Sequence, residues 1–389
     1  MAVYYFLQGM GGNPGLYTQS LQKFLKEVWG YGPAQAAALM TILIIPWSIK
    51  PLYGMLSDFL PIFGLRRKSY FILTGILATV TYLSLSFLYP SYTVVLTVLF
   101  VAAVCFAFSD VLCDAVMVEK GQPLNCTDRL QSVQWTAIGV AGVIIAFSKG
   151  YIAQYLSLQQ AVLLSAIFPA IMVVFTIAVL DEPKNQSSKE TARQAWSGLK
   201  TAAKTPLLWT TALFLFLFNC QPNLGTAFYY YEKDVLKFSD VLIGHIDAVG
   251  SVVWVLGTLL YGMIAKRFSH KALLRTVILT SFVTTLAYLF FKDKTSAFII
   301  TAGTSLVGPI AFLGLLTVAA KICPKHAEGV VFALLMSVLN FGGRIGGIIG
   351  GKLYERMGYS PLIIITAAII LLMWFLLPLV KEPKKESAS

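Results

Sequence analysis

The sequence predicts an all-α membrane protein with twelve transmembrane helices in two similar six-helix halves. Three observations lead to this prediction. Of the 389 residues, 57% are hydrophobic and only 12% are charged, and the mean hydropathy is +0.74. A soluble domain carries about twice that charged fraction. Apolar runs long enough to cross a bilayer recur along the chain, and one long polar stretch divides them near the middle.

Each expected span is a run of roughly 20 apolar residues. Eleven runs are clear, at 34–56, 69–89, 92–118, 132–150, 159–180, 206–231, 241–265, 272–291, 296–320, 328–351 and 360–380. Glycines and Pro14 interrupt the segment 1–21, which we expect to be a twelfth, broken span. Irregular backbone is tolerated at membrane depth where it faces protein or a water-filled cavity. A signal peptide is the alternative, although this segment lacks a basic n-region and an unbroken apolar core.

The polar stretch 181–205 follows the sixth span and separates two halves that share short matches. YGM recurs at 53–55 and 261–263, and EPK recurs at 182–184 and 382–384, which indicates duplication. The predicted parts are an N-terminal half 1–180, a cytoplasmic linker 181–205, a C-terminal half 206–380 and a cytoplasmic tail 381–389. The loops on the side of the termini carry about twice as many Lys and Arg residues as the others, which predicts cytoplasmic termini. Parallel six-helix halves are typical of the major facilitator architecture.

The loop after the second span predicts a gating latch formed by Gly54, Asp58, Arg66 and Arg67. Its spacing resembles the major facilitator motif G-x-x-x-D-x-x-G-R-R/K, lengthened before the second glycine. Gly54 permits close helix approach, Asp58 can pair or cap, and the basic cluster holds the cytoplasmic surface. Ordinary positive-inside charge is the alternative explanation for the arginines, but it does not explain the Gly/Asp spacing.

The run PWSIKPLYGMLSDFLPIFGLRRKSY at 46–70 resembles the folate–biopterin transporter family, and the segments 109–119, 130–135 and 323–337 agree. The resemblance covers roughly residues 5–378. It implies proton-coupled carriage of folate or a related pterin by alternating access. It also implies a bacterial inner membrane, a plastid envelope or a plasma membrane as the location.

Ionisable residues inside the expected spans are the strongest site candidates. Each costs about 2.5–3.5 kcal/mol at the bilayer centre, so each needs a partner or a cavity. Lys50 and Arg344, one from each half, could clamp an anionic substrate. Asp110, Asp114 and Asp247 are candidates to carry the coupling proton, and Asp114 could also accept hydrogen bonds from the substrate. Internal salt bridging is the alternative, with Lys50 paired to Asp110 or Asp114 and Arg344 paired to an acid of the second half.

Uncharged polar residues extend the predicted substrate site: Gln134, Trp135, Asn219, Asn223 and Asn340. Asn219 and Asn223 flank a proline in the seventh span, the counterpart of the broken first span. Trp135 could stack on a flat pteridine ring, and Gln134 precedes it. Hydrogen bonding between helices is the alternative role for each of the polar residues.

The sequence shows no pattern that indicates an enzyme. The three histidines do not cluster, the five cysteines form no CxxC pair, and no Ser/His/Asp grouping has a motif context. We therefore expect no metal, cofactor or nucleic acid. We also expect a monomer in the lipid bilayer. Two other hypotheses stay open: a major facilitator carrier of a different anionic or amphipathic metabolite, and a non-transporting membrane receptor or assembly factor.

Overall fold

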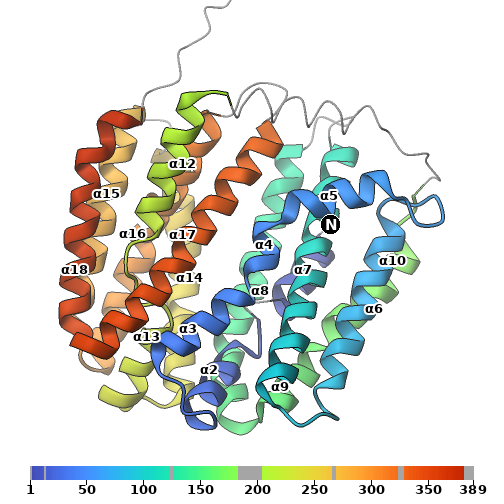
Figure 1. The fold of residues 1–389 in the computed structure, drawn as a ribbon, viewed down its shortest axis with the longest axis horizontal. Helices are drawn as coiled ribbons and strands as arrows, with labels where there is room; N and C mark the ends of the chain where they lie inside the picture. The colour runs from blue at the N-terminus through green and yellow to red at the C-terminus, as the bar shows by residue number, and fades with distance from the viewer. Residues whose placement is uncertain are drawn as a thin grey trace, which may run out of the picture. The chain divides into compact units, whose positions relative to one another are not determined.

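The computed structural model describes residues 2–12, 15–121, 127–182, 204–264, 269–322 and 328–380. These residues are almost entirely helical (Figure 1), and their only β-pairing is an isolated bridge between Ile62 and Leu65. Eight helical segments in this part of the chain are long and apolar enough to cross a membrane, by length and composition. Several of the other expected spans are divided into shorter helices. The all-α membrane fold predicted from the sequence is therefore confirmed.

The first six expected spans correspond to ten helices. They are α1 (Ala2–Gly11), α2 (Thr18–Glu27), α3 (Pro33–Ile42), α4 (Ile45–Ser48), α5 (Lys50–Phe59), α6 (Lys68–Ser84), α7 (Tyr92–Gly121), α8 (Thr127–Tyr155) and α9 (Leu158–Ser165), followed by α10 (Ile167–Val179). The first span is broken between α1 and α2, as its glycines predicted. The second span is also divided, because it bends on either side of the short helix α4.

The remaining spans contain one further broken element. The elements are α12 (Pro206–Asn219), α13 (Gly225–Tyr230), the π-helix η1 (Tyr231–Val235), α14 (Asp240–Ile264), α15 (His270–Ala287), η3 (Tyr288–Phe290), α16 (Lys294–Lys321), α17 (Glu328–Met357), α18 (Tyr359–Leu372) and η4 (Met373–Leu379). The break between α12 and α13 falls in the seventh span, where the sequence places a proline between polar residues.

The chain forms two compact units. Unit 1 comprises Met1–Tyr31, Leu39–Ala192 and Phe238–Ala248, and unit 2 comprises Gly32–Ala38, Arg193–Lys237 and Val249–Ser389. The first turns of α14 therefore belong to unit 1, and the start of α3 belongs to unit 2.

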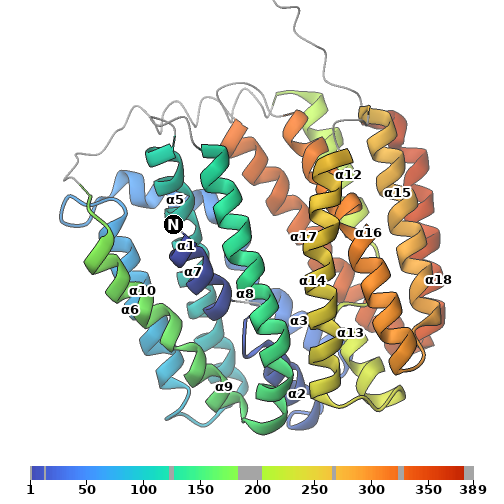
Figure 2. The same ribbon diagram turned by 180° about the vertical axis from the view of Figure 1, so that it is seen from behind.

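In unit 1, α1 packs against α7, α8 and α10, and α6 packs against both α7 and α10 (Figures 1 and 2). The core at this junction is rich in aromatic side chains. The Tyr4 ring stacks on Phe71 at 4.7 Å between centroids, and Tyr53 stacks on Phe108 at 5.1 Å. This packing places the polar side chains of α1 against those of α7.

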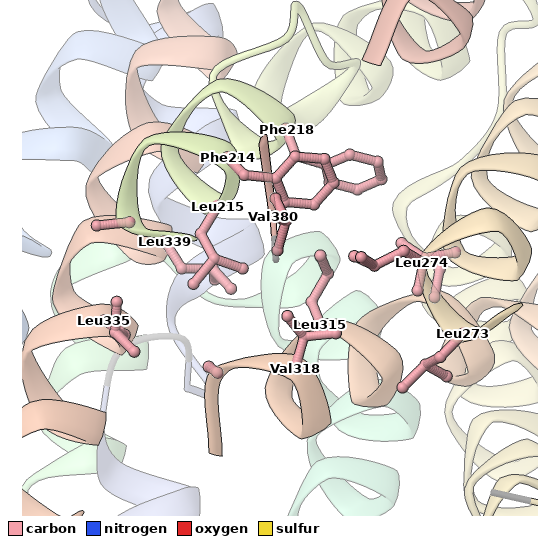
Figure 3. Packing of buried hydrophobic residues seen from close by; sticks show 14 of the residues in the cluster. Phe214, Leu215, Phe218, Leu273, Leu274, Leu315, Val318, Leu335, Leu339 and Val380 are labelled. Carbon is pink, nitrogen blue, oxygen red and sulfur yellow. The ribbon is translucent and has the colours of Figure 1, made fainter. Parts of the chain in front are cut away.

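In unit 2, α12 packs against α17, and α15 packs against α16 and α18. Figure 3 shows the buried side chains that fill this core. They include Phe214, Leu215, Phe218, Leu273, Leu274, Leu315, Val318, Leu335 and Leu339.

At both breaks, a side chain from a neighbouring helix donates a hydrogen bond to a backbone carbonyl that a continuous helix would pair within itself. The Tyr82 hydroxyl donates a hydrogen bond to the Gly11 carbonyl at the end of α1, at 2.8 Å. The Thr366 hydroxyl donates to the Pro222 carbonyl in the break of the seventh span, at 2.7 Å. An unpaired carbonyl in hydrocarbon costs several kcal/mol, so these two bonds allow the breaks to exist at membrane depth.

The second break also lies against the glycine-rich face of α17. The Asn223 backbone N–H donates to the Gly346 carbonyl at 3.2 Å, and its side-chain amide donates to the Gly343 carbonyl at 3.1 Å. A Cβ atom at Gly350 would overlap the Asn223 carbonyl oxygen. The small residues of α17 therefore let two backbones approach closely, which is their usual role between membrane helices.

We expect Gly350→Ala to destabilise the protein by about 1–3 kcal/mol, the usual cost of overpacking. The matched control on the same helix is Gly343→Ala, because no described atom lies within 4 Å of a Cβ atom built at Gly343. Thermal unfolding in detergent micelles measures both effects. Equal melting temperatures for the two variants would contradict the close approach at Gly350.

Candidate functional site

Two acids on α7 and two polar side chains on α1 form the centre of the candidate site in unit 1. Asp110 and Asp114 are four residues apart and share one face of α7. The Tyr5 hydroxyl donates to Asp114 Oδ1 at 2.7 Å, and Gln8 Nε2 donates to Asp110 Oδ1 at 2.6 Å. Tyr5 and Gln8 are three residues apart, so they share a face of α1 and each meets one acid.

Lys50 forms an ion pair with Asp110. Lys50 is the first residue of α5, directly after the bend at Ile49, and its Nζ atom lies 4.7 Å from the centroid of the Trp47 ring. Asp110 is buried, at 6% exposure. Of the two roles that the sequence left open for Lys50, internal pairing is the one that this geometry shows.

Asp114 has a different environment. Its Oδ1 atom also accepts a hydrogen bond from Gln134 Nε2 at 3.1 Å, so two neutral donors hold it. Among the described residues no base forms an ion pair with Asp114. The predicted site residues Lys50, Asp114 and Gln134 thus lie around one cluster, together with Asp110.

Unit 2 contains the other predicted polar residues. The side-chain amide of Asn219 donates to the Leu215 carbonyl of its own helix at 2.9 Å, and Asn223 holds the break against α17. Arg344 lies near the middle of the apolar window Leu334–Met357 and is partly buried. In the described part of the chain, neither Arg344 nor Asn340 has a side-chain hydrogen bond or an ion pair. The sequence expected either a substrate or an acid partner for Arg344.

Asp247, the third candidate for proton coupling, lies in the first turns of α14. It forms an ion pair with Lys149 of α8, and its side chain is 42% exposed. Gly150 and Gly244 bring these two helices together, since a Cβ atom at Gly244 would lie 3.0 Å from Gly150 Cα.

The predicted latch gains a partner that the sequence analysis did not include. The Glu182 carboxylate, after the end of α10, accepts backbone N–H bonds from Arg66, Arg67 and Lys68 at 2.7–3.1 Å. A carboxylate is favourable at a helix N-terminus, and here Arg67 is the N-cap and Lys68 the first residue of α6. Arg67 Nη1 donates to the Ser57 hydroxyl at 2.6 Å, and this hydroxyl donates to the Gly54 carbonyl. Glu182 therefore ties the end of the sixth span to the loop after the second.

Some predicted site residues lie outside what the structure describes. The side chains of Asp58 and Trp135 are outside the described part, although both residues belong to helices. Residues 183–203 of the predicted linker and the predicted tail 381–389 are outside it as well. Sequence reasoning missed Tyr5 as a site residue, and it did not include Gln8 among the predicted binding residues. The available signal was their three-residue spacing on an otherwise apolar helix.

We expect single substitutions of the Lys50–Asp110 pair to be costly and the double substitution to be tolerated. Lys50→Met alone should cost about 3–5 kcal/mol, because it leaves the buried charge of Asp110 uncompensated. Asp110→Asn alone should cost less, because the Lys50 side chain that it leaves is 32% exposed, and the double variant should recover most of the loss. The partly exposed Lys149–Asp247 pair is the control, and Lys149→Met should cost about 1 kcal/mol or less. Reversible unfolding in mixed micelles measures each value. Additive losses in the double variant would contradict the pairing.

Comparison with known proteins agrees with this architecture. A folate-biopterin transporter of Synechocystis sp. is 30% identical over 373 residues, which span 92% of this chain and 74% of the relative. Folate transporter 2 of Plasmodium falciparum is 23% identical over 87% of this chain and 76% of the relative. The crystal structure of the nucleoside transporter NupG superposes with a TM-score of 0.74 at 16% identity and covers 98% of both chains. This likeness confirms the major facilitator fold.

The match to a protein family extends over almost the whole chain. The profile of the BT1 family covers residues 8–382, which include the breaks after α1 and α12 and every residue of the candidate site except Tyr5. The chain therefore belongs to the BT1 family of membrane transporters rather than to an enzyme family.

Proposed function

We propose that the protein carries folate or a related pterin across a membrane by alternating access, with protons as the coupling ion. The names of the Synechocystis and Plasmodium relatives support the substrate class. One observation carries the mechanism, namely the unequal partnering of the intramembrane charges. Asp110 is paired with Lys50, whereas the described residues provide no base for Asp114 and no acid for Arg344.

Asp114 is the proposed proton carrier. Within the described residues its hydrogen-bond donors are neutral, and such a carboxylate in an apolar helix bundle can avoid the cost of a buried charge by binding a proton. Asp110 and Asp247 have lysine partners that already compensate their charge. Tyr5 and Gln134 can still hydrogen-bond Asp114 after it is protonated, so the site keeps its shape through the change.

Arg344 is the proposed receptor for the anionic part of the substrate. A guanidinium group stays charged and matches a carboxylate with two parallel hydrogen bonds. Folate carries glutamate carboxylates, and Asn340 lies one turn before Arg344 on the same helix face. The proposed clamp therefore uses Arg344 as its basic group, while Lys50 keeps its internal partner.

The proposed transport cycle moves the predicted halves 1–180 and 206–380 of a monomer against each other. Cytoplasmic termini, supported by the distribution of Lys and Arg, place the Glu182 contact and the loop around Arg66 and Arg67 on the inner side of the membrane.

For proton coupling, we expect Asp114→Asn to lose gradient-driven uptake and to keep exchange. Labelled biopterin or folate uptake into proteoliposomes with an inward proton gradient should fall by about 5- to 150-fold, the usual range of coupling between sites. Exchange of internal for external substrate without a gradient needs no net proton movement and should remain. Gradient-driven uptake at the wild-type level in Asp114→Asn would exclude this residue as the carrier.

For anion recognition, we expect Arg344→Gln to raise the KM for folate by about tenfold or more, because a charge-assisted hydrogen bond contributes about 1.5–3 kcal/mol. Biopterin lacks the glutamate carboxylates, so its KM should change little. Arg344→Lys keeps the charge without the bidentate geometry, so its KM for folate should lie between those of wild type and Arg344→Gln. Equal losses for folate and biopterin would contradict the proposed role.

A further inference from the structure

The side-chain amide of Gln8 has a hydrogen-bond partner for its nitrogen but none, among the described residues, for its oxygen. Its Nε2 atom donates to Asp110 Oδ1 at 2.6 Å, and this bond fixes the orientation of the amide. The Oε1 atom is buried and accepts no hydrogen bond from the described residues. The residue as a whole is 7% exposed. A buried acceptor without a donor costs about 1–3 kcal/mol, so this position calls for a ligand that offers an N–H or O–H group.

Trp47 lies next to the same ion pair and shows the complementary deficit, a buried donor without an acceptor among the described residues. Its ring lies 4.7 Å from Lys50 Nζ, and Lys50 is paired with Asp110. The indole Nε1–H group is buried and finds no acceptor among the residues that the structure describes. One chain of contacts therefore runs from Gln8 through Asp110 and Lys50 to Trp47. Within the described residues it has an unused acceptor at one end and an unused donor at the other.

We propose that Gln8 and Trp47 bind the amidine edge of a 2-aminopteridine ring. Gln8 Oε1 accepts a hydrogen bond from the exocyclic 2-amino group, and Trp47 Nε1–H donates to the neighbouring ring nitrogen N1. The 2-amino group and N1 are neighbours on the ring. The amino group supplies the donor that Gln8 Oε1 lacks in the described chain, and N1 supplies the acceptor that Trp47 Nε1–H lacks there. The Lys50–Asp110 pair has no net charge, which suits an uncharged ring.

This inference rests on the proposed function and adds to it the residues that select the ring. It separates two parts of the substrate, because Arg344 would bind the carboxylate while Gln8 and Trp47 would bind the ring. Asp114 is then free to carry the proton. The binding is noncovalent and requires no other reactant.

Lumazine is the discriminating probe. It has a carbonyl oxygen at position 2 and an N–H group at position 1, so it presents an acceptor to Gln8 Oε1 and a donor to Trp47 Nε1–H. A binding site that depends on hydrogen bonds rejects such an analogue because its own buried groups stay unpaired. The experiment measures how strongly unlabelled pterin and unlabelled lumazine inhibit labelled biopterin uptake into proteoliposomes. The ratio of the two inhibition constants is the selectivity.

Gln8→Leu removes the acceptor, and Trp47→Phe removes the donor while it keeps an aromatic ring near Lys50. The control is Ser20→Ala on α2, which removes a buried hydroxyl that has no partner in the described chain. We expect wild type and Ser20→Ala to prefer pterin by about 10- to 100-fold, and each of the other variants to lose most of this preference. Calorimetry with both probes on the purified protein gives the same ratio for a variant that folds but does not transport.

A wild-type selectivity ratio in both Gln8→Leu and Trp47→Phe would overturn the inference and leave the proposed function intact. Equal inhibition of wild type by pterin and lumazine would overturn it as well. If folded wild type takes up no biopterin, the proposed function fails and the inference fails with it.

Discussion

The arrangement of unit 1 depends on the cost of placing charged groups where water is absent. Asp110 is buried on a long apolar helix, and Lys50 supplies the opposite charge from the start of α5. Such a pair is tolerated only when further hydrogen bonds satisfy the remaining lone pairs. Gln8 meets that need for Asp110, and the contact fixes where α1 lies against α7.

The same constraint explains why the candidate coupling acid differs from its neighbour. Asp114 is one helical turn from Asp110 and would compete with it for a single lysine. The lysine pairs with Asp110, and Tyr5 and Gln134 hold Asp114 with neutral donors. Two carboxylates of identical chemistry thus receive different partners, and the one without a lysine partner among the described residues is the proposed proton carrier.

Broken helices serve this arrangement at two places. The breaks after α1 and α12 interrupt the backbone ladder, and side chains from neighbouring helices satisfy the exposed carbonyls. In unit 2, the glycines of α17 let Asn223 approach the helix backbone directly. Arg344 lies among those glycines, so the segment that permits close packing also carries a cation that has no acid partner in the described chain.

Sequence reasoning found several residues of the candidate site because an ionisable group in an apolar run is conspicuous. Lys50, Asp110, Asp114 and Arg344 are recognisable in this way. Glu182 was missed as a latch residue because its partners are backbone N–H groups of a loop more than a hundred positions away. Tyr5 and Gln8 are ordinary residues of membrane helices, and only their contacts with the two acids single them out.

The sequence by itself determined that this is a helical membrane transporter, because hydrophobic runs of bilayer length and the family motifs are local properties of the chain. It also determined which charges the membrane must accommodate. Only the tertiary structure decided which charges neutralise each other. A charge selects its partner by distance in space, and helix packing sets that distance between residues such as Lys50 and Asp110, which are sixty positions apart in the chain.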